Sequence, residues 1–220
     1  MILQTILARL APHECLGCEA EGALLCQACA TSLDAVPARC YRCHKLTTGA
    51  RTCESCRSSS PIFGVHVAYA YRGLAKDIVW QLKFSGAQAA AREMADQMSH
   101  LATIPADAVV VPVPTATSRV RRRGFDQAKL LGRSLAVQTG LPYAPVLRRL
   151  GQHHQVGATR AQRVTQLRDA YRCAGASRIR GRHVLLIDDV LTTGATLEAA
   201  AQALKAAGAA RVSAAVFAQA

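Results

Sequence analysis

From residue 65 onward, hydrophobic and polar positions alternate between strand-like and helix-like patterns. Residues 65–71 and 211–218 are rich in β-branched and aromatic side chains, and residues 108–113 and 183–188 are short continuous apolar runs, so all four predict strands. Helical periodicity lies between them, over residues 74–83, 87–101, 125–138 and 195–207. Continuous apolar strands that alternate with helices predict an α/β fold, a parallel sheet with helices on both faces.

The first sixty residues differ from the rest. They contain few large apolar side chains, too few for a core of their own: Leu24, Leu25, Leu33, Val36 and Leu46. A polar stretch closed by proline, Arg57–Pro61, is the best boundary candidate. The chain of 220 residues has room for one domain of about 150 residues and a small module. We therefore expect a module over residues 1–60 and a domain over residues 61–220.

Metal binding by cysteines can replace the hydrophobic core that this module lacks. Eight of the nine form four CxxC pairs: Cys15/Cys18, Cys26/Cys29, Cys40/Cys43 and Cys53/Cys56. Two CxxC turns complete the tetrahedral Cys₄ shell that structural zinc prefers, so the spacing predicts a zinc-ribbon module with two zinc ions. Sequential use of neighbouring pairs closes the smaller loops and is favoured, although an interleaved pairing stays open.

Other interpretations of these residues are weaker. Residues 40–44 match the CxxCH motif for haem attachment, but that chemistry belongs outside the cytosol and the pair sits within a series of zinc knuckles. His13 and His44 flank the cysteines, and since eight thiols already fill two sites, we expect them near or outside the ligand shells. Cys173 stands alone and is expected to act as a small buried hydrophobe.

The N-terminal residues and the apolar runs bear on location. Residues 1–10 have no basic residue before their apolar stretch and no small-residue cleavage site, so we interpret them as a short amphipathic lead-in. No run approaches the roughly 18 apolar residues of a membrane helix. We therefore expect a cytoplasmic protein without a membrane span, in a compartment that keeps thiols reduced.

The net charge of +13 is concentrated in one stretch. Residues 119–182 contain fourteen arginines and one lysine but only two acidic residues, Asp126 and Asp169. A preference for arginine in a GC-rich genome would explain arginine over lysine, but not the clustering of the excess. Guanidinium groups suit bidentate phosphate contacts, so we expect a phosphate-rich partner, a small polyphosphate or a nucleic acid.

Candidate chemistry follows the two central strands, where ligands of such sheets bind. After the strand over residues 183–188, two carboxylates are followed by hydroxyls and a glycine that open onto a helix. Free backbone N–H groups there can cradle a phosphate dianion, while carboxylates can accept from sugar hydroxyls and hold Mg²⁺. The stretch indicates a ligand that carries both a diol and a phosphate. It runs from Leu186 to Thr196.

This eleven-residue stretch resembles the signature of type I phosphoribosyltransferases, which bind phosphoribosyl pyrophosphate (PRPP). The resemblance implies that Asp188 and Asp189 hold the ribose hydroxyls with Mg²⁺ nearby. It also implies that residues 192–196 cradle the 5-phosphate. The PRPP-binding residues of this turn would be Leu191, Thr192, Thr193, Gly194, Ala195 and Thr196. In the same fold, the loop after the strand over residues 108–113 binds pyrophosphate; here it would use Pro114, Thr115, Arg119 and Arg123. The alternative is that the arginine cluster is only a solvated turn with no ligand.

Taken together, the cysteine module, the VPVP and RGFDQ motifs, the basic segment 155–171 and the 186–196 stretch resemble the ComF/GntX family. The resemblance covers nearly the whole chain and implies a role in natural transformation, with incoming single-stranded DNA and the uptake machinery as partners. It also implies a flap over the active site at residues 155–171. Two positions depart from the family pattern: Asp126 and Gln166 stand where asparagine is usual.

Three functions remain open. The first is a phosphoribosyltransferase, in which Asp188 and Asp189 orient the ribose and Arg119 neutralises the departing pyrophosphate; no residue set identifies its acceptor. The second is a non-catalytic nucleic-acid-binding adaptor that uses the zinc module and the arginines, with PRPP as a regulatory ligand. Its support is partial, because Tyr41 is the only aromatic residue within the cysteine module. The third is a protein-interaction module on an inactive scaffold, which binds neither ligand.

Overall fold

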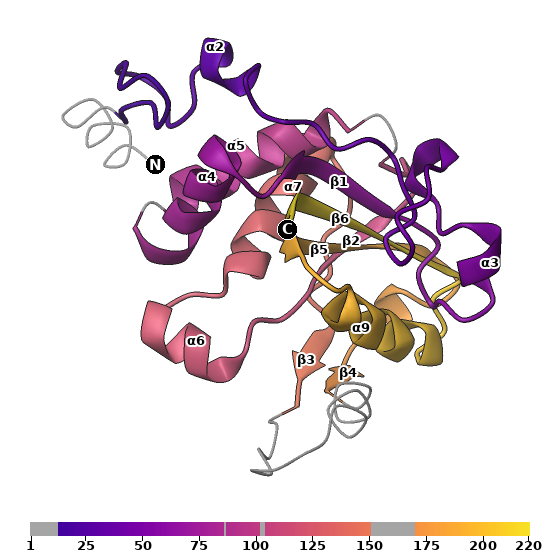
Figure 1. The fold of residues 1–220 in the computed structure, drawn as a ribbon. Coiled ribbons are helices and arrows are strands. Elements are labelled where there is room, and N and C mark those ends of the chain that lie inside the picture. The colour runs from indigo at the N-terminus through magenta and orange to yellow at the C-terminus, as the bar shows by residue number, and fades with distance from the viewer. Residues whose placement is uncertain (1–12, 86, 102–103, 151–169) are drawn as a thin grey trace, which may run out of the picture.

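A four-stranded parallel sheet forms the centre of the molecule (Figure 1). The computed structural model describes residues 13–85, 87–101, 104–150 and 170–220. The strand order is β1-β6-β5-β2, with every neighbouring pair parallel. The strands are β1 (Val65–Ala70), β2 (Val109–Pro112), β5 (His183–Leu191) and β6 (Arg211–Gln219). The four expected strands and their parallel arrangement are confirmed.

Helices cover both faces of this sheet, as the alternation of patterns predicts. Three of them lie against one face: α4 (Gly73–Phe84), α5 (Ala87–Ser99) and α7 (Gln127–Thr139). The opposite face is covered by α9 (Ala195–Ala206) (Figure 1). Helix α9 buries Leu197, Ala200, Ala201 and Leu204, an i, i+3, i+4, i+7 stripe that explains both its helicity and its orientation.

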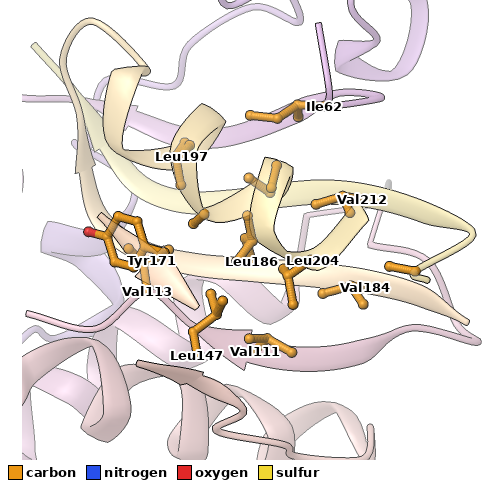
Figure 2. Close-up of a cluster of buried hydrophobic side chains, with 14 of the residues drawn as sticks. Ile62, Val111, Val113, Leu147, Tyr171, Val184, Leu186, Leu197, Leu204 and Val212 are labelled. Carbon is orange, nitrogen blue, oxygen red and sulfur yellow. The ribbon is translucent and has the colours of Figure 1, made fainter. Parts of the chain in front are cut away.

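The hydrophobic core has two parts, one on each face of the sheet. Successive residues of β5 point to opposite faces. Val184 and Leu186 pack with Leu204 of α9 (Figure 2). Leu185 and Ile187 belong to the part of the core on the side of the other helices. Because β5 is buried on both faces, its sequence is a continuous apolar run up to Asp188.

Two features were not expected from the sequence. The arginine cluster, expected in a loop, lies in the helix α6 (Thr117–Arg123); with Val120 as its only large apolar residue, the segment has no amphipathic pattern to reveal it. In addition, β3 (Leu147–Arg149) and β4 (Tyr171–Cys173) form a separate antiparallel pair. Three residues are too few to show the alternation that identifies a strand.

The cysteine-rich region packs onto the sheet rather than forming its own core. Over its described residues, 13–60, it contains only short elements: α2 (Gln27–Ala30), the 3₁₀ turn η1 (Thr48–Ala50) and α3 (Glu54–Arg57). Its apolar residues join both parts of the core: Leu24, Leu25 and Leu33 on the side of α4 and α5, and Tyr41 on the side of α9. The shortage of apolar residues is therefore met by neighbours outside the region.

Some expectations concern residues outside the described part of the chain. These are the amphipathic lead-in at residues 1–10 and the flap, of which only residues 170 and 171 are described; Gln166 is outside as well. The 3₁₀ turn η2 (Ala176–Arg178) completes the described elements. Within the described ranges, no helix has the length and apolar character needed to cross a membrane.

Candidate functional site

A polar cavity of about 400 Å³ lies at the carboxyl ends of β2 and β5. Seven predicted ligand-binding residues line it: Pro114, Thr115, Arg119, Asp188, Asp189, Thr192 and Thr196. A larger hollow of about 570 Å³ lies between α5 and α7, but no carboxylate lines it. Strand ends are where open parallel sheets bind ligands, so the polar cavity is the candidate site.

Two adjacent aspartates at the end of β5 reach this cavity. The Asp189 N–H donates to Asp188 Oδ1 at 2.9 Å, and Lys83 Nζ of α4 lies 2.8 Å from Asp189 Oδ2. Burial, together with the negative charge of Asp189, raises the pKa of Asp188 well above the ordinary aspartate range. A cationic or hydroxyl-bearing ligand would relieve this unfavourable charge.

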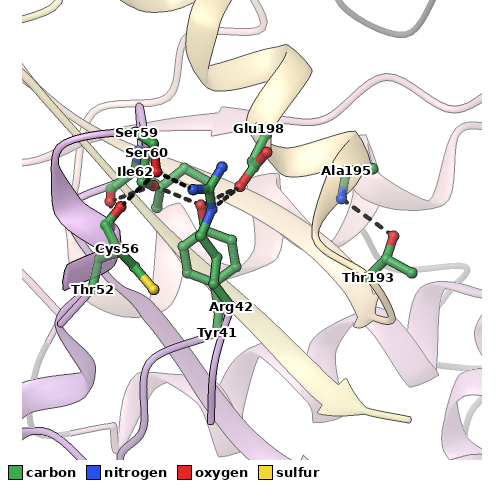
Figure 3. Close-up of polar contacts among 10 residues, drawn as sticks. All are labelled: Tyr41, Arg42, Thr52, Cys56, Ser59, Ser60, Ile62, Thr193, Ala195 and Glu198. Carbon is green, nitrogen blue, oxygen red and sulfur yellow. Dashed lines mark hydrogen bonds and ion pairs between the residues drawn. The ribbon is translucent and has the colours of Figure 1, made fainter. Parts of the chain in front are cut away.

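The phosphate cradle, defined as residues 192–196, connects β5 to α9. Gly194 has φ +78°, a left-handed conformation that favours glycine, and it is the N-cap of α9. The Thr193 hydroxyl accepts from the Ala195 N–H at 3.4 Å (Figure 3). Since the first turn of a helix leaves N–H groups without helical partners, the cradle presents donors together with the hydroxyls of Thr192 and Thr196.

Four other residues predicted to bind PRPP do not line the cavity. Three are the cradle residues Thr193, Gly194 and Ala195. The fourth is Leu191, whose side chain is 2% exposed and belongs to the core. Any contact of Leu191 with a ligand would therefore come from its backbone. The roles of these four residues stay predictions.

The loop after β2 is tied to α7 by the residue that departs from the family pattern. Asp126 is the N-cap of α7: its Oδ1 accepts from the Lys129 N–H at 3.4 Å and from the Thr115 hydroxyl at 3.0 Å. An asparagine Oδ1 could accept both bonds as well, so the aspartate preserves the geometry and adds a negative charge.

The arginines of α6 divide into two groups. Arg119, Arg121 and Arg122 are exposed, and none forms an ion pair with the described residues. Arg123 does not line the cavity; its guanidinium lies 5.2 Å from the centre of the Phe84 ring. Burial and the neighbouring Arg119 and Arg122 lower the pKa of Arg123.

Several cavity residues were not identified as site residues from the sequence. Lys83 and Tyr71 come from the first strand–helix unit, and Arg149 and Tyr171 come from the β3–β4 pair. Gln127 follows the N-cap of α7; it is 5% exposed, and its Oε1 has no hydrogen-bond partner among the residues that the structure describes. A buried amide oxygen without a partner at the cavity wall is suited to accept from a ligand. Gln127 had a signal as part of the RGFDQ motif, and Tyr171 had one as the last residue of the flap expected over the active site.

The structure brings the eight paired cysteines into two groups, in the sequential arrangement that was favoured. The groups are Cys15/Cys18/Cys26/Cys29 and Cys40/Cys43/Cys53/Cys56, and within each the sulfur atoms lie within 4.8 Å of one another. The Cys26 N–H donates to Cys15 Sγ at 3.3 Å and lowers the pKa of Cys15 to about 6. In contrast, side-chain hydrogen bonds with the other three cysteines, that with Cys26 above all, raise the pKa of Cys29 to about 12. Four thiols this close ionise together only with a cation, so both groups could hold a metal ion.

Comparison with known proteins agrees with this geometry. The family model described as a phosphoribosyl transferase domain matches residues 86–220. Competence protein ComFC of Bacillus subtilis (strain 168) is 29% identical over 191 residues, which cover 82% of this chain and 77% of that protein. DNA utilization protein YhgH of Salmonella typhi is 34% identical over 147 residues, which cover 61% of this chain and 63% of that protein.

Among solved structures, glutamine PRPP amidotransferase from B. subtilis, complexed with ADP and GMP, is 20% identical with a TM-score of 0.44. The match covers 59% of this chain and 26% of that one, so the chain spans about a quarter of the enzyme's length. The sheet topology, the two cysteine groups and the family match together confirm the expected fold class, an α/β phosphoribosyltransferase fold preceded by a cysteine-rich module. The chain therefore belongs to the phosphoribosyl transferase domain family, as a ComF-like member.

Proposed function

We propose that the chain binds PRPP with Mg²⁺ in the cavity at the ends of β2 and β5. The observation that carries this proposal is the pair Asp188 and Asp189, which lies beside a phosphate cradle in one polar cavity. In the proposed complex the two carboxylates accept from the ribose hydroxyls, the cradle binds the 5-phosphate, and Arg119 faces the pyrophosphate. In a transfer reaction these groups would hold the ribose and stabilise the leaving pyrophosphate.

The residues of the cavity fit Mg²⁺ as well as PRPP. Asp188 and Asp189 offer the hard oxygen ligands that Mg²⁺ prefers, and the pKa of Asp188 is raised by burial and by Asp189 even with Lys83 nearby. Gln127 Oε1 adds a buried acceptor that has no partner within the described part of the chain. When bound, Mg²⁺ would neutralise part of the charge of the pyrophosphate.

PRPP with Mg²⁺ is expected to raise the melting temperature of the chain. At a concentration one hundred times its dissociation constant, a ligand stabilises by about 2.7 kcal/mol, which corresponds to a shift of a few degrees. The measurement is a thermal melt with and without PRPP and Mg²⁺. The shift should disappear in the Asp188→Asn/Asp189→Asn variant, whereas Asp107→Asn, an exposed aspartate at the opposite end of the sheet, should retain it. An unchanged melting temperature in the parent chain would contradict PRPP binding.

We further propose that both cysteine groups bind zinc. We also propose that residues 1–60 form the zinc-binding module and that residues 61–220 form the phosphoribosyltransferase-like domain. Four thiols with N–H···S bonds form the closed sulfur shell that structural zinc prefers. Such thiols require a reducing compartment, which supports a cytoplasmic location.

A second candidate function, binding of single-stranded nucleic acid, is supported by a surface next to the cavity. On α4, Trp80 and Phe84 are 53% and 54% exposed, and their ring centres lie 5.5 Å apart. The Arg123 guanidinium lies over the Phe84 ring, and the exposed arginines belong to the same helix, α6. We call Trp80, Phe84 and the arginines of α6 the aromatic–arginine surface. Exposed rings beside guanidinium groups that form no ion pair with described residues suit stacked bases and phosphates, and the relatives are named for competence and DNA utilization. We propose that the protein acts on single-stranded DNA during uptake.

An oligothymidylate is expected to quench the fluorescence of Trp80, the single tryptophan of the chain. Stacking contributes about 1–3 kcal/mol per base, so Phe84→Ala should weaken binding at least fivefold, whereas Val137→Ala, which alters an exposed apolar residue of α7, should not. Affinity should fall with salt at a slope of about −0.7 per neutralised phosphate. Oligonucleotide binding that leaves Trp80 fluorescence unchanged would locate the contact elsewhere.

A further inference from the structure

Two residues that lie between ligands of the second cysteine group contact the phosphate cradle and the helix that follows it. Cys40 and Cys43 enclose two residues, Tyr41 and Arg42, and both reach the first turn of α9 (Figure 3). The Tyr41 hydroxyl donates to Glu198 Oε1 at 2.6 Å, and Arg42 Nε donates to the same oxygen at 2.6 Å. Glu198 therefore accepts two hydrogen bonds from residues about 156 positions away in the sequence.

The Tyr41 ring also lies against the glycine of the cradle. A Cβ atom added to Gly194 would be 2.9 Å from Tyr41 Cδ2, closer than real contacts allow. Tyr41 is 4% exposed and belongs to the core under α9. The ring is thus a rigid wall behind the turn, and Gly194 is required both by its positive φ and by this wall.

The contact is held from the other side by the residues after the last cysteine pair. The Ser60 hydroxyl lies 2.6 Å from the Tyr41 hydroxyl, and Arg42 Nη1 donates to Ser59 Oγ at 2.6 Å. Tyr41 and Arg42 are therefore fixed between the end of the cysteine-rich region and α9. Their orientation depends on the knuckle of Cys40 and Cys43, whose sulfurs belong to the second group.

Among the described residues, the first cysteine group lies against α4 and makes no comparable contact with the cradle. A Cβ atom added to Gly17, within the Cys15–Cys18 knuckle, would lie 3.1 Å from Leu74 Cδ1 of α4, and Cys29 packs on the core on that side of the sheet. The two groups therefore brace different parts of the molecule, which provides an internal control.

We propose that Tyr41 and Arg42 are positioning residues for the phosphate cradle, acting through Gly194 and Glu198, and that occupancy of the second cysteine group is coupled to phosphate binding. The ligand side of this inference rests on the proposed PRPP site. By thermodynamic linkage, a metal that orders the knuckle favours phosphate binding, and bound phosphate favours metal retention to the same extent.

The test compares Tyr41→Ala, Tyr41→Phe and Arg42→Ala, with Lys45→Ala as the control for an exposed residue next to the same knuckle. All four should retain two zinc ions per chain. Hydrogen–deuterium exchange of amides 192–198 in the ligand-free chain should be at least fivefold faster in Tyr41→Ala and unchanged in Lys45→Ala. Tyr41→Phe, which keeps the ring and loses the hydroxyl, should fall between the two.

Affinity for PRPP with Mg²⁺ should follow the same order, with a loss of about tenfold in Tyr41→Ala. Cys43→Ser should have the same effect, whereas Cys18→Ser, in the first group, should leave exchange and affinity at the cradle unchanged. Unchanged exchange at residues 192–198 in both Tyr41→Ala and Cys43→Ser would overturn the inference. Faster exchange in a chain that does not bind PRPP would retain the positioning role and overturn only the proposed ligand.

Discussion

Removal of metal is expected to unfold the cysteine-rich region and to lower the stability of the whole chain. Structural zinc contributes about 10–16 kcal/mol in zinc-finger peptides, and this region has few apolar residues of its own. The chain should contain two zinc ions, and a strong chelator should lower its melting temperature and expose residues 13–60 to proteolysis. Atomic spectroscopy and limited proteolysis measure the two effects.

The ninth cysteine provides the matched control. Cys53→Ser, within the second group, should leave one zinc ion per chain, because a shell of three thiolates binds the metal less tightly. Cys173→Ser alters a thiol of β4 outside both groups and should leave two. A metal-free chain that melts at the same temperature as the zinc-bound chain would show that the thiols are not structural ligands.

Lys83→Met is expected to destabilise the chain by about 3 kcal/mol, since it removes one partner of a buried ion pair. This value is the lower end of the usual range of such losses, because Lys83 borders an open cavity. The Asp189 side chain is 9% exposed and would lose the ammonium group that lies 2.8 Å from its Oδ2. Unfolding by urea measures the loss.

Two further variants separate the ion pair from a loss of helix packing. Lys76→Met, at an exposed position of the same helix, should change stability by less than about 0.5 kcal/mol. Asp189→Asn should restore part of the stability lost in Lys83→Met, because the amide has no charge to compensate. Equal losses in Lys83→Met and Lys76→Met would show that the pair does not stabilise the fold.

Much of this architecture could be predicted because strong local patterns coincide with buried elements. β5 is buried on both faces, so its apolar run and the aspartates that follow mark both a strand and its ligand-binding end. The CxxC pairs likewise indicate metal groups through spacing alone. Helix α6 and the β3–β4 pair were not predicted, because a short arginine-rich helix and three-residue strands show no hydrophobic periodicity in the sequence.

Contacts between distant residues explain the rest. Nothing near Lys83 in the sequence indicates an ion pair with Asp189, and Tyr41 meets Glu198 across 157 positions. Such pairs depend on how the helices and the cysteine-rich region are arranged on the sheet, which a single sequence does not encode in any local pattern. The site was therefore identified by its strand-end motif, while the side chains that support it were found only in the fold.

The division of the cysteine-rich region between both parts of the core restricts how such a protein can evolve. Leu33 packs on the side of α4 and α5, and Tyr41 packs on the side of α9. A foreign zinc ribbon joined to the same transferase sheet would leave holes on both sides, however well it bound its metal. The two regions are therefore expected to be inherited as a unit, and substitutions in one should be accompanied by compensating substitutions in the other.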